Sequence, residues 1–280
     1  MDSNSKPHQP IGIFDSGVGG LSVLRAIRDL LPHEHTLYMA DQAHIPYGPR
    51  PKGDIRDFAF GITDFLLAQG AKLIVVACNT ASAAALHDLR ARFIGVPFVG
   101  MEPAVKPAAK LTQTGRVGVL ATPTTFAGEL YAALVDRFGQ GIEIYQNTCS
   151  GLVEQIERGD LNSTATREIL EAALTPMLTD NVDTIVLGCT HYPFVIPLIE
   201  SITGPGVRTI DPAPAIARQT WRLLNEFSWL NPSEDQGELQ FFTSGETSGF
   251  ETMLLRLLGE TGEVSQVIWK NFKLETAAPS

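Results

Sequence analysis

Cysteine is scarce in this sequence, and its spacing excludes the commonest structural uses of the residue. The 280 residues include three cysteines, which cannot all pair in disulfides, and neither C-x-x-C nor a zinc-type ligand spacing occurs. We therefore expect reduced thiols in a cytoplasmic protein, and we expect no bound metal.

Long apolar runs and an excess of positive charge are also missing. No stretch approaches the roughly 20 apolar residues that a membrane-spanning helix needs, and the polar residues 1–10 lack the apolar core of a secretion signal. The 31 acidic residues outnumber the 21 lysines and arginines, which gives a net charge of -10. This balance argues against nucleic acid or an anionic membrane as the main partner.

The remaining composition is that of a soluble globular protein. Hydrophobic residues make up 44% of the chain and charged residues 19%, values that favour a packed core over disorder. A chain of 280 residues is long enough for one large domain or two moderate ones.

One stretch of the sequence occurs twice. IVVACNTAS at 74–82 and TIVLGCTHY at 184–192 each read as an apolar run, a small residue, a cysteine and then polar residues. Such a run is typical of a buried strand that opens into a loop. Cys78 and Cys189 would then follow the carboxyl ends of two parallel strands, where open α/β sheets bind their ligands.

Two weaker matches recur at nearly the same separation. RVGVLAT at 116–122 resembles IGIFDS at 11–16, with Gly118 lying 106 residues after Gly12, and TIDPA at 209–213 resembles VGMEPA at 99–104. The three matches keep one order and predict two pseudo-symmetric α/β domains with mostly parallel central sheets and an active site in the cleft between them. The first domain would comprise residues 11–100 and 211–280, and the second residues 101–210.

The helices expected between these strands follow from apolar spacing. We predict helices over 54–69, 81–93, 124–138, 166–178, 215–227 and 250–258. The second would start beside Cys78, where the positive end of the helix dipole favours a thiolate. Pro176 is expected to kink or end the fourth of them early, while Trp221 and Leu224 are expected to face the core from the fifth. The glycine-rich turn DSGVGG at 15–20 is either a tight connection or a loop whose backbone N–H groups face an anion.

Two thiols in one cleft permit disulfide exchange, metal binding or proton transfer. Disulfide chemistry normally uses C-x-x-C, which is absent, and metal binding needs more ligands than His191, the only obvious neighbour. Proton transfer needs a base on one face of a substrate and an acid on the other, an arrangement that two related halves supply. Cys149 is expected to be a small hydrophobic residue of the core.

Four motifs together resemble the bacterial glutamate racemases. They are DSGVGG at 15–20, PYG at 46–48, ACNTA at 77–81 and GCTHYP at 188–193, and the resemblance extends from residue 11 to the FTSG segment at 242–245. It implies a cofactor-independent enzyme, often homodimeric, that interconverts L- and D-glutamate and supplies D-glutamate for peptidoglycan.

The resemblance also implies roles for individual residues. Cys189 would deprotonate L-glutamate with help from His191, and Cys78 would deprotonate D-glutamate with help from Asp15. Glu157 would pair with the histidine or contact the substrate ammonium group, although Glu154 lies one helical turn away. From the residues alone, Asp15 reads equally as a cap for the helix after Gly20, and His191 as a loop hydrogen-bonding residue.

Substrate binding is expected to use mostly neutral donors, which do not force a nearby thiol into its anionic form. The candidates are Asp15, Ser16, Asn79, Thr80, Thr190 and His191, with backbone N–H groups of Tyr47 and Gly48. The chain departs from the family at Ser150, where a proline often follows the third cysteine.

Two alternatives stay open from the sequence. A racemase of the same class could act on aspartate or a related acid. A protein of this fold could also bind a partner, for example as a regulator of a DNA-processing enzyme, although the acidic balance argues against direct DNA contact.

Overall fold

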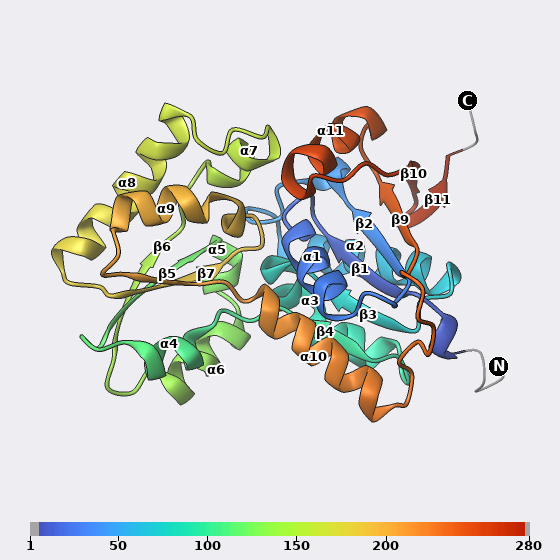
Figure 1. The fold of residues 1–280 in the computed structure, drawn as a ribbon, viewed down its shortest axis with the longest axis horizontal. Helices are drawn as coiled ribbons and strands as arrows, with labels where there is room; N and C mark the ends of the chain where they lie inside the picture. The colour runs from blue at the N-terminus through green and yellow to red at the C-terminus, as the bar shows by residue number, and fades with distance from the viewer. Residues whose placement is uncertain (1–5, 278–280) are drawn as a thin grey trace.

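The computed structural model describes residues 6–277, which form two units around two separate sheets (Figure 1). The first sheet has seven strands in the order β11-β10-β9-β2-β1-β3-β4. Its strands are β1 (Ile11–Asp15), β2 (Thr36–Ala40), β3 (Leu73–Val76), β4 (Phe98–Gly100), β9 (Leu239–Thr243), β10 (Val264–Lys270) and β11 (Lys273–Thr276). All neighbouring strands are parallel except β10 and β11.

Helices cover both faces of this sheet. One apolar cluster joins it to α1 (Leu21–Leu30), α10 (Ala213–Glu226) and α11 (Thr247–Leu258), and a second joins it to α2 (Lys52–Ala68) and α3 (Asn79–Arg92). Successive strand residues alternate between the clusters, as Ile13 enters the first and Phe14 the second. Burial of both faces explains why these strands are continuous apolar runs in the sequence. Short 3-10 turns, η1 (Lys6–His8) and η2 (Gln42–His44), complete the unit.

The second sheet has four parallel strands in the order β6-β5-β7-β8. They are β5 (Arg116–Ala121), β6 (Glu143–Asn147), β7 (Thr184–Gly188) and β8 (Arg208–Ile210). One face packs on α7 (Leu152–Glu157), α8 (Thr164–Thr179) and α9 (Ile196–Thr203), and the other on α4 (Val105–Leu111) and α6 (Glu129–Phe138). The short helices α5 (Pro123–Phe126) and η3 (Tyr192–Val195) follow β5 and β7.

The two sheets share one strand order. β2-β1-β3-β4 of the first corresponds to β6-β5-β7-β8 of the second, so β1 matches β5 and β3 matches β7. The predicted α/β class with mostly parallel sheets is confirmed. We propose that the domains are residues 11–100 with 211–280, and 101–210, because the strands of each sheet come from these segments.

Two expectations about the helices are wrong. The helix predicted over 124–138 is two helices, because the chain breaks at Gly128 between α5 and α6. Trp221, expected in the core, is 45% exposed, whereas Leu224 is buried as expected. Of the two effects expected of Pro176, an early end of the helix does not occur, because α8 continues to Thr179. The pair β10 and β11 was not predicted, and no helix within residues 6–277 is long and apolar enough to cross a membrane.

A buried ion pair ties the first unit together at the end of its sheet remote from the loops that follow β1 and β3. Lys72 Nζ lies 2.6 Å from Glu34 Oε2, and both side chains are at most 2% exposed. The ammonium group also donates to the carbonyl oxygens of Pro7 and Trp229, at 2.7 and 2.8 Å. Burial lowers the pKa of Lys72, and the hydrogen bond and charge of Glu34 oppose that effect.

Removing one member of this pair is expected to destabilise the protein strongly. Lys72→Met leaves the Glu34 carboxylate buried without its counter-charge, a situation that costs about 3–5 kcal/mol. Chemical denaturation monitored by circular dichroism should show this loss, and Lys72→Met combined with Glu34→Gln should recover part of it. Equal stability of the single variant and the wild type would contradict the expectation.

Candidate active site

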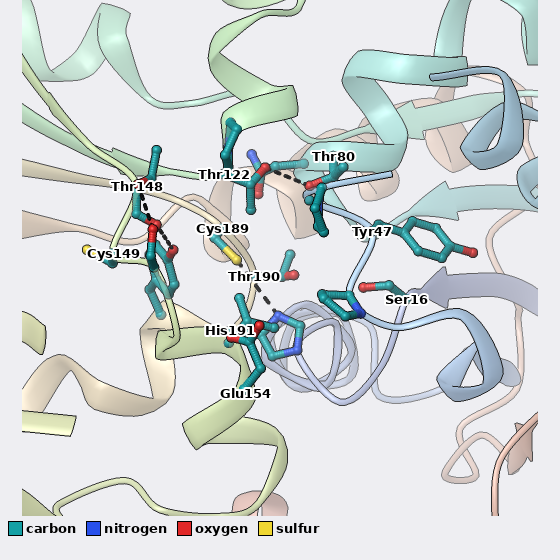
Figure 2. A pocket seen from close by; sticks show the side chains of 18 of the residues that line it. Ser16, Tyr47, Thr80, Thr122, Thr148, Cys149, Glu154, Cys189, Thr190 and His191 are labelled. Carbon is teal, nitrogen blue, oxygen red and sulfur yellow. Dashed lines mark hydrogen bonds between the residues drawn. The ribbon is translucent and has the colours of Figure 1, made fainter. Parts of the chain in front are cut away.

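A cavity lies between the two units, beside the loops that follow β1, β3, β5 and β7 (Figure 2). Its volume is about 190 Å³. That is smaller than the roughly 300–1,000 Å³ of pockets for drug-sized ligands, and it fits a ligand of amino-acid size. The predicted site residues in its wall are Ser16, Tyr47, Gly48, Cys78, Asn79, Thr80, Cys189, Thr190 and His191.

Cys78 follows β3 and caps α3. Its Sγ accepts a hydrogen bond from the backbone N–H of Ala81 at 3.4 Å. The sequence predicted that this helix N-terminus would favour a thiolate. Burial nevertheless raises the pKa of Cys78 well above its ordinary value, and the charge of Asp15 raises it further. The hydrogen bond from the Ala81 N–H lowers the pKa, but by less. Cys78 is therefore a thiol at neutral pH.

Cys189 follows β7, at the position equivalent to Cys78, and has a different partner. Its Sγ lies 3.8 Å from Nδ1 of His191, whose Nε2 lies 2.6 Å from Oε1 of Glu157 (Figure 2 shows the thiol and the ring). Burial lowers the pKa of His191, but hydrogen bonds to Cys189 and Glu157 outweigh it and leave the pKa well above its ordinary value. The ring is thus held as an imidazolium between two acidic groups.

The glycine-rich loop at 15–20 brings the two units into contact. A Cβ at Gly17 would collide with Glu157 Oε1, and a Cβ at Gly19 would collide with His191 Nδ1, so the close approach of these two side chains requires glycine at both positions. The backbone N–H of Val18 donates to Glu157 Oε1 at 2.7 Å. An N–H group of this loop therefore does face an anion, and the anion is a carboxylate of the other unit.

Asp15 lies behind the cavity wall at the end of β1 and is fully buried. Its Oδ2 accepts from the backbone N–H of Gly20 at 2.7 Å; Gly20 itself is the N-cap of α1, so Asp15 holds the residue that begins the helix and is not its cap. Burial raises the pKa of Asp15, opposed by the charge of His191 and a hydrogen bond with Cys78. The charge of Asp15 thus acts on Cys78, and Glu157 pairs with His191, the partner of Cys189.

Glu157 and Glu154 lie in different places. Glu157 forms a hydrogen bond with His191 and accepts a second one from Gln42 Nε2 at 3.4 Å, whereas Glu154 is part of the cavity wall. Of the two contacts expected for Glu157, the structure shows the one with the histidine.

Asn79 and Tyr47 meet the cavity in contrasting ways. Asn79 is 2% exposed, and neither polar atom of its side chain has a hydrogen-bond partner among residues 6–277. A buried amide without partners is costly, which is consistent with a ligand that supplies them. The Tyr47 ring points away from the cavity (Figure 2), and its hydroxyl donates to Asp41 Oδ2 at 2.7 Å. Tyr47 therefore lines the cavity with its backbone and not with its ring.

Several further residues line the cavity. Pro46 and Tyr192 belong to the motifs quoted above, and Glu154 is the alternative considered for Glu157. The others were not predicted from the sequence: Pro49, Thr122, Pro123, Thr148, Cys149, Ser150, Gly151 and Val153. Thr122 could have been found, because it lies 106 residues after Ser16, the separation of Gly12 and Gly118. Its Oγ1 lies 2.8 Å from that of Thr80, across the two units. The neighbouring Thr124 Oγ1 donates to Gly48 O at 2.6 Å.

Cys149 belongs to the apolar cluster that also contains Cys189, as expected, and it additionally forms part of the cavity wall. Its sulfur points away from Cys189 (Figure 2). Burial raises the pKa of its thiol to about 12, so the group is protonated at neutral pH.

The chain is similar to known racemases over most of its length. The family model for Asp/Glu/hydantoin racemases matches residues 12–220. The glutamate racemase of Ectopseudomonas mendocina is 50% identical over 255 residues, covering 91% of this chain and 97% of that protein. A glutamate racemase isoform of Bacillus anthracis superposes with a TM-score of 0.84 at 31% identity, covering 95% and 99% of the two chains. The Escherichia coli glutamate racemase, solved with L-glutamate and an activator, gives 0.80 at 34% identity, covering 96% and 100%.

Proposed function

This chain belongs to the Asp/Glu/hydantoin racemase family, and from that membership we propose that it interconverts L- and D-glutamate with two cysteines. The observation that carries the proposal is the equivalent placement of Cys78 and Cys189 after β3 and β7, at one small cavity. The relatives named glutamate racemase, one of them solved with L-glutamate, support the substrate. The enzyme is then an isomerase.

The proposed reaction moves one proton off the α-carbon and another onto it. The Cys189 thiolate removes the α-proton of L-glutamate, forming an S–H bond as the C–H bond breaks. The Cys78 thiol then gives its own proton to the opposite face of the carbanion, which yields D-glutamate and a Cys78 thiolate. The reverse reaction exchanges the roles, and the two thiols regain their starting states by proton exchange with solvent.

The neighbours of each thiol support this division of roles. The imidazolium of His191, held by Glu157, places a positive charge 3.8 Å from the Cys189 sulfur. Asp15 and burial favour a thiol at Cys78. We propose that the free enzyme uses Cys189 as the base and Cys78 as the acid, the arrangement required for L-glutamate. We propose Asp15 and His191 as the proton-exchanging partners of the two thiols.

Neutral donors are proposed to hold the substrate. Asn79 would bind a carboxylate with its unpaired amide, together with Ser16, Thr80, Thr190 and the backbone of Tyr47 and Gly48. No lysine or arginine among residues 6–277 lines the cavity. Apart from the His191 imidazolium beside Cys189, the cavity wall thus has no cationic side chain in the described part of the chain, and these neutral donors add no full positive charge that would lower the pKa of the Cys78 thiol.

We further propose that the product serves peptidoglycan synthesis, and that the enzyme works in the cytoplasm as a homodimer without a cofactor. The resemblance to the glutamate racemases supports these points.

Substrate discrimination tests the proposal directly. The purified protein, without added cofactor, should racemise both glutamate enantiomers when followed by circular dichroism. Aspartate lacks one methylene group, a difference worth about 10–200-fold in kcat/KM. A larger kcat/KM for aspartate would identify the related racemase, and no racemisation of either acid would leave a binding role for the fold.

A further inference from the structure

The segment that brings Tyr47 and Gly48 to the cavity begins at Asp41, a residue outside the cavity wall. Asp41 follows β2 and is fully buried, and its carboxylate accepts hydrogen bonds from four side chains. Tyr47 Oη donates at 2.7 Å and His44 Nδ1 at 2.9 Å, both to Oδ2. Ser244 Oγ and Trp269 Nε1 each donate to Oδ1 at 2.7 Å.

These donors come from two parts of the chain. His44 and Tyr47 belong to the same segment as Asp41, whereas Ser244 follows β9 and Trp269 lies in β10. The carboxylate therefore fastens the segment to the C-terminal strands. No residue after Tyr192, among those described, lines the cavity.

We propose that Asp41 is a positioning residue that sets the place of the Tyr47–Gly48 backbone in the cavity wall and thereby the affinity for glutamate. The proposal rests on the proposed function. Because the Tyr47 hydroxyl is bonded to Asp41 and the ring lies away from the cavity, the side chain anchors its own backbone (Figure 2). Through Asp41, β9 and β10 act on substrate binding without touching the substrate.

Aromatic packing around the carboxylate reinforces the anchor. The His44 ring stacks on Phe58 with centroids 3.8 Å apart, and Trp269 lies 5.3 Å from His44 and 5.7 Å from Phe58. These rings exclude water from the hydrogen bonds, which strengthens bonds to a charged acceptor. An asparagine at 41 would turn an NH₂ group toward two donors and lose their bonds.

The test is the split between KM and kcat in four variants of the full chain. Asp41→Asn and Tyr47→Phe should each raise KM for both glutamate enantiomers roughly tenfold, the usual effect of losing a bond to a charged group, and should leave kcat within about threefold. Trp269→Phe removes one hydrogen bond to the same carboxylate and should therefore also raise KM roughly tenfold. Trp229→Phe, whose ring packs on the first apolar cluster away from Asp41, is the matched control and should leave KM unchanged.

A double-variant cycle separates positioning from general destabilisation. Asp41→Asn combined with Tyr47→Phe should raise KM no further than Asp41→Asn alone, because both changes remove one anchor. The proposal would be overturned if the two changes raised KM multiplicatively in the double variant, or if Asp41→Asn lowered kcat at unchanged KM. An unchanged KM in Trp269→Phe would also overturn it, and this test remains available if Asp41→Asn fails to fold. Wild-type racemisation in the same assay tests the proposed function separately.

Discussion

Cys78→Ala and Cys189→Ala are each expected to lower kcat/KM for glutamate racemisation at least about 10³-fold, because each removes one of the two groups that move the proton. The loss should be the same from either enantiomer, since the equilibrium constant between enantiomers is 1 and kcat/KM must then be equal in both directions. Circular dichroism from pure L- and pure D-glutamate measures both values.

Cys149→Ala is the matched control for these two variants. It removes the third thiol of the chain, whose sulfur points away from Cys189, and it should retain activity within about fivefold because no proton-transfer step uses it. Retention of more than a tenth of wild-type activity in either Cys78→Ala or Cys189→Ala would contradict the two-thiol mechanism.

His191→Asn is expected to reduce kcat/KM by about 10²-fold, because the Cys189 thiolate loses its imidazolium partner. Only the proton transfers to and from Cys189 should become slower. Proton removal from L-glutamate then becomes limiting, so the isotope effect of 2-deuterated L-glutamate should rise and that of 2-deuterated D-glutamate should fall toward 1.

Asp15→Asn provides the mirror-image control, because the charge of Asp15 acts on Cys78. Its isotope effects should change in the opposite sense, rising for D-glutamate and falling for L-glutamate. The same pattern in both variants would contradict the assignment of one partner to each thiol.

The raised pKa of His191 also predicts how stability depends on pH. A histidine whose folded-state pKa lies above its unfolded value of about 6.5 stabilises the fold most fully below that value. The contribution is lost as pH rises through the folded-state pKa. The difference in unfolding free energy between wild type and His191→Asn should therefore be largest below pH 6.5 and shrink at alkaline pH.

The sequence predicted the parts of the site that are local. Cys78 and Cys189 stand out because each ends a buried strand in one of two repeated segments, and the repeat places them on equivalent loops. Thr122 follows from the same repeat once it is aligned with Ser16. The continuous apolar runs that predict β3 and β7 result from burial of both faces of each sheet.

Contacts between distant segments were beyond such reasoning. Whether the glycine-rich loop accepts a ligand or a protein carboxylate depends on how Glu157 packs against it across the two units. The roles of Ser244 and Trp269 depend on β9 lying beside β2 and on β10 lying beside β9, pairings that no local pattern encodes. The electrostatics of Cys78 were misjudged because the helix N-terminus is visible in the sequence while its burial beside Asp15 is not.

Two different thiols act on opposite faces of the substrate in the proposed mechanism, and hydrogen exchange with solvent tests this most directly. Wild-type enzyme converts L-glutamate in deuterium oxide, and both enantiomers are analysed by mass spectrometry before a tenth has reacted. Two bases predict deuterium at the α-carbon of the D-glutamate formed and almost none in the L-glutamate left. Equal deuterium in both from the outset would mean a single base, and would contradict the mechanism.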